Sequence, residues 1–152
     1  MASLTVLIAT VEREICRGRA RRVVAPSAGG ELAILPGHAP LLALLRPGAV
    51  RIDRLEEDAA CDARCEELFV ISGGWLEVQP EGVTILADSF ERAEAIDEAE
   101  AQRAVERARA VWAGSGVGGG GADRALVALE LALARLQVVR RRSRHHPPVG
   151  RP

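Results

Sequence analysis

The stretch from Gly30 to Ile52, GELAILPGHAPLLALLRPGAVRI, joins apolar runs through a Pro-Gly-His-Ala-Pro turn. Pro36 and Pro40 fix their own φ angles and restrict the residues before them, so the backbone around His38 has little freedom. A rigid turn that projects a histidine between apolar shoulders suits a protein-contact site better than an enzyme site. The alternative is a turn that only reverses the chain and leaves His38 in solvent.

Short runs rich in valine, isoleucine and leucine continue to about Ala93, and glycine, proline, aspartate and serine bound them. Their spacing of roughly 8–12 residues is typical of an all-β sandwich or barrel. Two runs, RIDRL and WLEVQ, alternate in polarity, which predicts one buried face and one solvated face. We expect strands within residues 4–11, 14–18, 20–26, 31–35, 41–45, 49–55, 67–73, 75–80 and 83–88.

The sequence period changes after Ala93, where alanine becomes frequent and apolar residues recur with the spacing of an α-helix. Asp97 is a good N-cap for this helix, and Glu100 three residues later resembles a capping box. The apolar stripe of this first helix comprises Ala101, Ala104, Val105, Ala108, Val111 and Trp112.

A glycine-rich break at residues 114–121 separates this helix from a second one, which favours a flexible hinge between the two. The stripe of the second helix comprises Leu126, Leu129, Leu133 and Leu136. Small residues facing leucines favour an antiparallel hairpin, which is too small to be stable without a further surface to pack on. We therefore predict a β domain at residues 1–93, a helical hairpin at 94–142 and a disordered tail at 143–152.

Composition excludes several classes of function. The net charge of −1 gives no overall field that would attract nucleic acid or an acidic membrane. All 20 basic residues are arginine, so Schiff-base chemistry and the P-loop lysine are excluded. We expect a soluble chain in a reducing compartment, because no secretory signal and no span of roughly 20 apolar residues is present. Cys16, Cys61 and Cys65 are expected to be free thiols rather than metal ligands.

The residues offer little for catalysis. His38 has no neighbouring serine or cysteine to activate, so we expect no enzyme activity, no metal and no cofactor. A competing hypothesis is a binding module for RNA or another anion, using the arginines between Arg13 and Arg22, although the chain has only two Phe, two Trp and no Tyr for base stacking. The basic run at residues 140–144 is either a solvated helix end or a docking surface for an acidic protein or nucleic acid.

Two long motifs carry a resemblance to a known family. GELAILPGHAPLLALLRPGAVRI and FVISGGWLEVQPEGVTILADSFERAEAID, followed by two helices, resemble the epsilon subunits of bacterial F-type ATP synthases from Leu4 to about Arg142. The resemblance implies a β-sandwich of about ten strands in two sheets, followed by an antiparallel α-helical hairpin. It also implies a non-catalytic subunit of the central stalk that couples proton flow to ATP synthesis. Such a subunit lies peripherally on the cytoplasmic side of the bacterial inner membrane.

The resemblance further implies three partners, namely the gamma subunit, the ring of c subunits and the alpha–beta head. Glu31 matches a position that faces the polar loops of the c ring, and His38 matches one at the gamma contact. The implied partner-binding residues are Glu31, Pro36, Gly37, His38, Ala39 and Pro40.

The hairpin is implied to regulate, either folded against the sandwich or extended along gamma into the head, where it blocks ATP hydrolysis. The arginines implied to meet an acidic segment of the beta subunit are Arg135, Arg140, Arg141 and Arg142. Some members also bind ATP on the hairpin through an Ile-Asp-x-x-Arg-Ala motif and further arginines. Here Glu100 and Leu131 replace two of those arginines, and the charge of Glu100 would repel a triphosphate. The remaining nucleotide-binding candidates are Asp97, Arg107 and Arg135.

Overall fold

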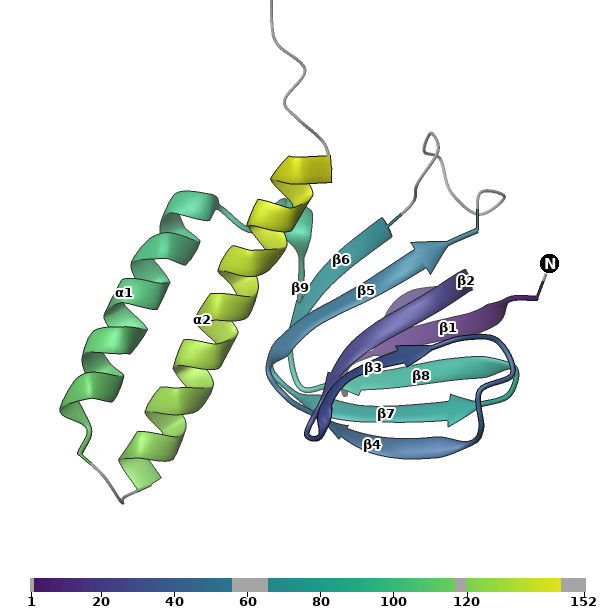
Figure 1. The fold of residues 1–152 in the computed structure, drawn as a ribbon, viewed down its shortest axis with the longest axis horizontal. Coiled ribbons are helices and arrows are strands. Elements are labelled where there is room, and N and C mark those ends of the chain that lie inside the picture. The colour runs from purple at the N-terminus through teal and green to yellow at the C-terminus, as the bar shows by residue number, and fades with distance from the viewer. Residues whose placement is uncertain (1, 56–65, 117–119, 146–152) are drawn as a thin grey trace, which may run out of the picture.

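The computed structural model describes residues 2–55, 66–116 and 120–145. Within these residues the chain forms nine strands followed by two long helices (Figure 1). The strands are β1 (Leu4–Ala9), β2 (Glu14–Ser27), β3 (Gly30–Ile34), β4 (Leu41–Leu45), β5 (Gly48–Arg54), β6 (Glu66–Ile71), β7 (Gly74–Gln79), β8 (Gly82–Ala87) and β9 (Phe90–Arg92). The helices are the short 3-10 helix η2 (Ala93–Ala95), α1 (Glu98–Gly114) and α2 (Gly120–His145).

The strands form a sandwich whose layers share one long strand. β2 pairs with β1, β3, β4 and β5, and so takes part in both layers. From β2, one branch of the hydrogen-bond network runs through β4, β7 and β8 to β1, and the other runs through β5 and β6 to β9. The expected β-sandwich followed by a helical hairpin is confirmed, with nine strands in the described residues where about ten were expected.

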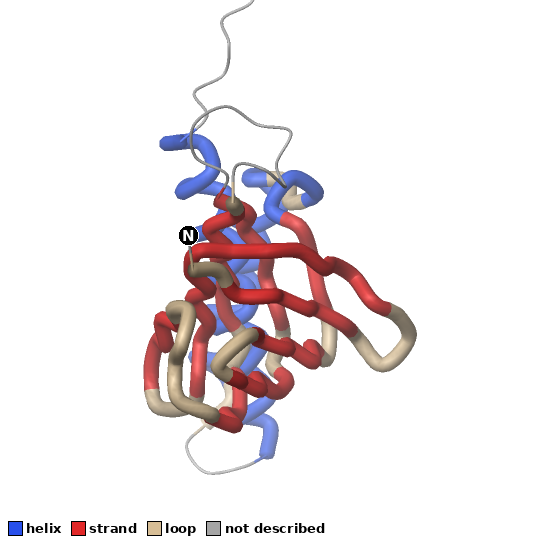
Figure 2. The backbone as a smooth tube through the Cα atoms, turned by 90° about the vertical axis from the view of Figure 1, so that its right-hand side faces the viewer, coloured by secondary structure: helices blue, strands red, loops and turns tan. Residues whose placement is uncertain are grey.

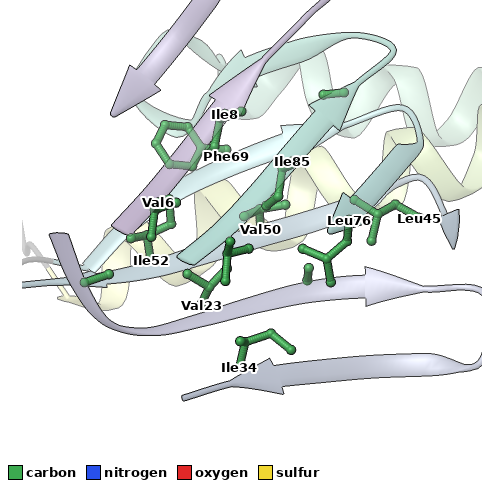
Figure 3. Close-up of a cluster of buried hydrophobic side chains, with 14 of the residues drawn as sticks. Val6, Ile8, Val23, Ile34, Leu45, Val50, Ile52, Phe69, Leu76 and Ile85 are labelled. Carbon is green, nitrogen blue, oxygen red and sulfur yellow. The ribbon is translucent and has the colours of Figure 1, made fainter. Parts of the chain in front are cut away.

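The alternation seen in the sequence determines which side chains enter the sandwich core. Ile52 of β5 and Leu76 and Val78 of β7 are fully buried, as the RIDRL and WLEVQ patterns predict, and Val50 of β5 is buried on the same face as Ile52. Figure 3 shows Val50, Ile52 and Leu76 converging with aliphatic side chains from the other strands. Each fully buried side chain of this size contributes roughly 1.5–3 kcal/mol, so the sandwich is the stable body of the chain.

The expected division between residues 14–18 and 20–26 is wrong, because β2 runs through both without a turn. Gly18 lies within the strand, paired with Val6 of β1, and a Cβ at this position would collide with Arg54 Nη1. β9 was not expected either. It is three residues long, which is too short for a periodic pattern to be recognised.

Arg54 is a buried cation that the alternation of β5 brings to the inner face. Its side chain is 7% exposed, and Nη2 donates to Glu67 Oε2 at 2.9 Å and contacts Cys16 Sγ. Burial opposes the charge, but hydrogen bonding and charge attraction from Glu67, together with Cys16, raise the pKa of Arg54. Arg54 therefore stays charged, and Glu67 is needed to compensate it.

The helical hairpin covers one outer face of the sandwich. α1 and α2 lie side by side along one side of the strands in Figure 1 and behind them in Figure 2. The seam between hairpin and sandwich contains Leu68 and Val70 of β6 with Leu136 and Val139 of α2. The hairpin thus has the further surface that the sequence requires of it.

The predicted apolar stripes are correct in part. Ala101 and Val105 of α1 are buried, whereas Val111 and Trp112, on the last turns of α1, are exposed. On α2, Leu136 is buried, but Leu126 is 43% exposed and its place in the packed stripe is wrong. Leu126 fails because its neighbour Ala125 takes the buried face of α2 at this turn, in line with the buried Ala132 and Leu136 further along the helix.

The helix ends differ from the predicted boundaries. α1 ends at Gly114, and α2 already begins at Gly120, inside the expected glycine break, of which residues 117–119 lie outside the described residues. α2 continues three residues beyond the predicted end of the hairpin, to His145. The rest of the expected tail, as well as Cys61 and Cys65, also lies outside the described residues. No helix among the residues described has the length and apolarity to cross a bilayer.

Candidate functional site

The connection between β3 and β4 is a restrained turn. The amide of His38 donates to the carbonyl of Leu35 at 3.1 Å, which closes a four-residue turn with Pro36 and Gly37 at its centre. Gly37 has φ +79°, so the turn has the type II geometry that favours proline second and glycine third. The amide of Gly37 donates in turn to the carbonyl of Pro80 at 3.1 Å, which ties the turn to the connection between β7 and β8.

The imidazole ring of His38 also forms a hydrogen bond within this turn. Its Nδ1 lies 2.8 Å from the carbonyl oxygen of Ala39, to which it donates when Nδ1 carries the proton. The side chain is half-buried, whereas Ala39 and Pro40 are exposed. The turn therefore presents a stiff, largely apolar corner, which has the properties of a contact surface.

Glu31 lies apart from this corner, at the opposite end of β3. A five-residue strand is about 17 Å long, so Glu31 and Pro36 lie too far apart to touch the same small group. Glu31 is 64% exposed and its Oε1 accepts a hydrogen bond from Arg51 Nη2 at 2.6 Å. The structure thus separates the expected partner-binding residues into two places, Glu31 and the corner at residues 36–40.

An exposed apolar row, formed by Leu42, Leu44, Trp75 and Leu86, extends from the corner over the outer face of β4, β7 and β8. These side chains are 67%, 50%, 50% and 52% exposed. Trp75 pairs directly with Leu44 on one side and with Leu86 on the other, so the row is continuous across the strands. Apolar clusters of this kind on a sheet face are typical of protein interfaces.

Sequence reasoning missed this row, although a signal was present. LLALL has no polar residue at any position, so one of its two faces must leave leucines uncovered unless a partner covers them. In WLEVQ, Leu76 and Val78 take the inner face, which forces Trp75 outward. The outward tryptophan beside an all-apolar strand predicts an interface.

The arginines expected to meet an acidic partner are occupied in the docked hairpin. Arg135 donates to Glu91 of β9, and Arg141 donates to Glu66 of β6, each through Nε and Nη2. Side-chain hydrogen bonds with Glu91 and Glu66 raise the pKa of Arg135 and Arg141 above the ordinary value. Arg142 Nη1 donates to the carbonyl of Ala93 at 2.5 Å, and Arg140 Nη2 donates to Gln102 Oε1 at 3.1 Å.

The nucleotide-binding candidates do not form one site. Asp97 caps α1, where its Oδ1 accepts from the amide of Glu100 at 2.8 Å. Arg107 and Arg135 both line a groove of about 330 Å³ between α1 and α2, which is lined mainly by alanines and does not include Asp97. Glu100 binds Arg107 at 2.7 Å, and the hydrogen bonds from Arg107 and then Arg103 lower the pKa of Glu100.

Two of the arginines between Arg13 and Arg22 are paired with carboxylates. Arg17 pairs with Glu14 at 2.8 Å, and Arg22 pairs with Asp53 at 2.7 Å. Among the residues that the structure describes, no group of three His, Cys, Asp or Glu side chains is arranged to hold a metal ion.

Comparison with known proteins identifies the family. The family model described as "ATP synthase, Delta/Epsilon chain, beta-sandwich domain" matches residues 3–93. The chain is 45% identical to the ATP synthase epsilon chain of Legionella pneumophila (strain Corby) over 131 residues, which cover 86% of both chains. This chain belongs to the ATP synthase delta/epsilon family. It is also 43% identical to the epsilon chain of Bordetella parapertussis over 139 residues, or 91% of this chain and 92% of that one.

Solved structures support the fold of this delta/epsilon family member. One similar chain belongs to the Euglena gracilis mitochondrial ATP synthase, in a structure of OSCP, F1 and c-ring. The match covers 88% of this chain and 79% of that one, with a TM-score of 0.73 and 22% identity. A chain of the Tetrahymena thermophila central stalk and c-ring matches 90% of this chain with 96% of its own, at a TM-score of 0.58 and 15% identity. The resemblance found in the sequence is confirmed, and the RNA-binding alternative gains no support.

Proposed function

We propose that this chain is the epsilon-type subunit of the central stalk of a proton-translocating rotary ATP synthase. The observation that carries the proposal is the 43–45% identity to ATP synthase epsilon chains, which extends over 86–91% of the chain and therefore over sandwich and hairpin alike. The subunit couples the rotor to the catalytic head and catalyses no reaction itself. It lies peripherally on the cytoplasmic side of a bacterial inner membrane.

The gamma subunit is the proposed partner of the corner at residues 36–40 and of the apolar row. The corner is held by hydrogen bonds to Leu35 and Pro80, so it can transmit force without rearranging. Next to it, Leu42, Leu44 and Trp75 offer apolar area that is costly to leave in water. A stiff corner beside an apolar row suits a permanent contact within a rotor.

The c ring is the proposed partner of Glu31. This carboxylate is exposed at the end of β3 remote from the corner, so one sandwich can contact gamma and the c ring at once. An arginine on a c-subunit loop would compete with Arg51 for Glu31. Such an exchange of one exposed ion pair for another costs little free energy.

The hairpin is the proposed regulatory element. When it leaves the sandwich, Arg135, Arg140, Arg141 and Arg142 become available to an acidic segment of a beta subunit in the alpha–beta head, and ATP hydrolysis is blocked. Nucleotide binding by Asp97, Arg107 and Arg135 has less support. The charges of Arg107 and Arg135 are already paired with Glu100 and Glu91, and the groove between them is lined mainly by alanines.

Cysteine crosslinking in the assembled complex tests the two contacts separately. The full chain with His38→Cys is expected to crosslink to a cysteine introduced in gamma, and the chain with Glu31→Cys to a cysteine in a c-subunit loop. The two variants are matched controls, because each is expected to fail with the other's partner. Crosslinks absent from both, or exchanged between them, would refute the proposed arrangement.

Hydrolysis by the reconstituted complex tests the regulatory role. Truncation after Gly116 removes α2 and leaves the sandwich and α1. ATP hydrolysis is expected to rise relative to the complex with the full chain. Unchanged hydrolysis would contradict the inhibitory role without affecting the proposed contacts of the sandwich.

A further inference from the structure

Two paired arginines attach α2 to the sandwich at separate points. Arg135 Nε and Nη2 lie 2.7 and 2.9 Å from the carboxylate oxygens of Glu91 on β9. Arg141 Nε and Nη2 lie 3.0 and 2.8 Å from those of Glu66 on β6. Both contacts have the planar two-bond geometry that makes arginine–carboxylate pairs strong and specific in orientation.

A third charge contact has the opposite polarity. Glu130 of α2 accepts from Arg46, which follows β4. Glu130 and Arg141 are eleven residues apart, or about 16 Å along the helix, so the charge contacts extend over a large part of α2. The contacts of Arg135 and Arg141 are part-buried, but the two arginine side chains are still 35% and 39% exposed, so salt reaches both pairs.

An apolar seam lies between these contacts. Beside Leu68, Val70, Leu136 and Val139, its buried members are Ile96, Val105, Val138 and the alanines at positions 93, 101, 132 and 134. The apolar seam supplies most of the affinity, but the hydrophobic effect has no direction, so the seam alone fixes the orientation of α2 poorly. The charge pairs fix this orientation and add a smaller share of the affinity, up to about 1 kcal/mol each.

We propose that Glu66 and Glu91 form an acidic docking site within the chain itself, which holds the hairpin against the sandwich as a charge-dependent latch. Each of these glutamates pairs with an arginine that the proposed function assigns to a carboxylate on another protein. Release of the hairpin then exchanges one carboxylate partner for another. The latch concerns the isolated chain, and only the identity of the second partner rests on the proposed function.

The test measures how often the hairpin leaves the seam of the full chain. Val70→Cys places a reporter thiol at a position that is 2% exposed and that α2 covers, after the native thiols are replaced by Cys16→Ser, Cys61→Ser and Cys65→Ser. Its rate of reaction with a thiol reagent reports the undocked fraction. Glu66→Gln with Glu91→Gln is expected to raise this rate about tenfold, since each pair contributes up to about 1 kcal/mol.

Two controls make the result specific. Glu14→Gln removes a similar two-bond pair with Arg17 on β2, away from α2, and should leave the rate unchanged. Val50→Cys places a reporter in the sandwich core, so a parallel rise there would indicate unfolding rather than release, and would overturn the inference.

Salt provides an independent measurement. In about 1 M NaCl, where the Debye length is about 3 Å, the Val70→Cys rate should rise in the parent chain and change less in the double glutamine variant. A rate that responds neither to the two substitutions nor to salt would refute the latch. Because the assay contains no gamma subunit, c ring or head, its outcome is separate from that of the proposed function.

Discussion

Replacement of Trp75 by alanine should weaken binding of the full chain to purified gamma subunit about 70-fold. Trp75 is 50% exposed at the centre of the apolar row. A tryptophan can bury up to about 250 Å², so docking of gamma would cover about 100 Å² of this side chain. At about 25 cal/mol per Å², that area corresponds to about 2.5 kcal/mol, which is the range of an interface hot spot. This free energy converts to the stated factor in the dissociation constant.

Trp112 provides a matched control for this prediction. It is also 50% exposed, but it lies near the end of α1 rather than on the sheet face. Titration calorimetry with gamma should find the affinity of Trp112→Ala unchanged, and thermal unfolding should show that both variants are folded. If Trp75→Ala binds within threefold of the parent, or if Trp112→Ala loses as much, the apolar row is not the gamma contact.

Three further predictions concern individual positions. Gly37→Ala places a side chain at φ +79° and should destabilise the fold by about 1–2 kcal/mol, which lowers the melting temperature by about 2–8 °C. Gly29→Ala is the control, because position 29 has room for a Cβ and the melting temperature should not change. Asp97→Ala removes the cap of α1, worth about 1 kcal/mol, so first-turn amides should exchange about fivefold faster. The pKa of Glu100 is lowered chiefly by its hydrogen bond with Arg107. The ionised carboxylate therefore stabilises the folded state above pH 4.5, the ordinary value, and this contribution is lost as the pH falls below it. Arg107→Ala should raise the titration midpoint of Glu100 measured by NMR.

The parts of the fold that follow local rules could be predicted from the sequence. Alternation in RIDRL and WLEVQ assigned the inner faces of β5 and β7 correctly, because a strand exposes its two faces in strict turn. Asp97 was recognised as an N-cap because the side chain of aspartate suits the free amides at a helix start. The Pro-Gly pair at 36–37 likewise favours the type II turn that forms there.

The parts that depend on distant residues could not be predicted. Gly18 has the appearance of a strand break, but it pairs with Val6 inside β2, and the guanidinium that fills the space beside it belongs to Arg54, 36 positions along the chain. The pairing of Arg141 with Glu66 spans 75 residues and follows no local pattern. Leu126 is exposed while Ala125 beside it is buried, and this choice depends on how α2 is rotated in the assembled molecule.

The energetics of the hairpin argue that a partner must take part in its release. Undocking exposes Leu68, Val70, Leu136 and Val139, at a cost of about 1.5 kcal/mol for each side chain, or about 6 kcal/mol together. With the arginine pairs added, the undocked state of the isolated chain is rarer than about one in ten thousand. A partner can reverse this balance only if it covers the apolar face of α2 and supplies carboxylates to Arg135 and Arg141. A purely acidic peptide should therefore fail to release the hairpin, while a surface that is both apolar and acidic should succeed.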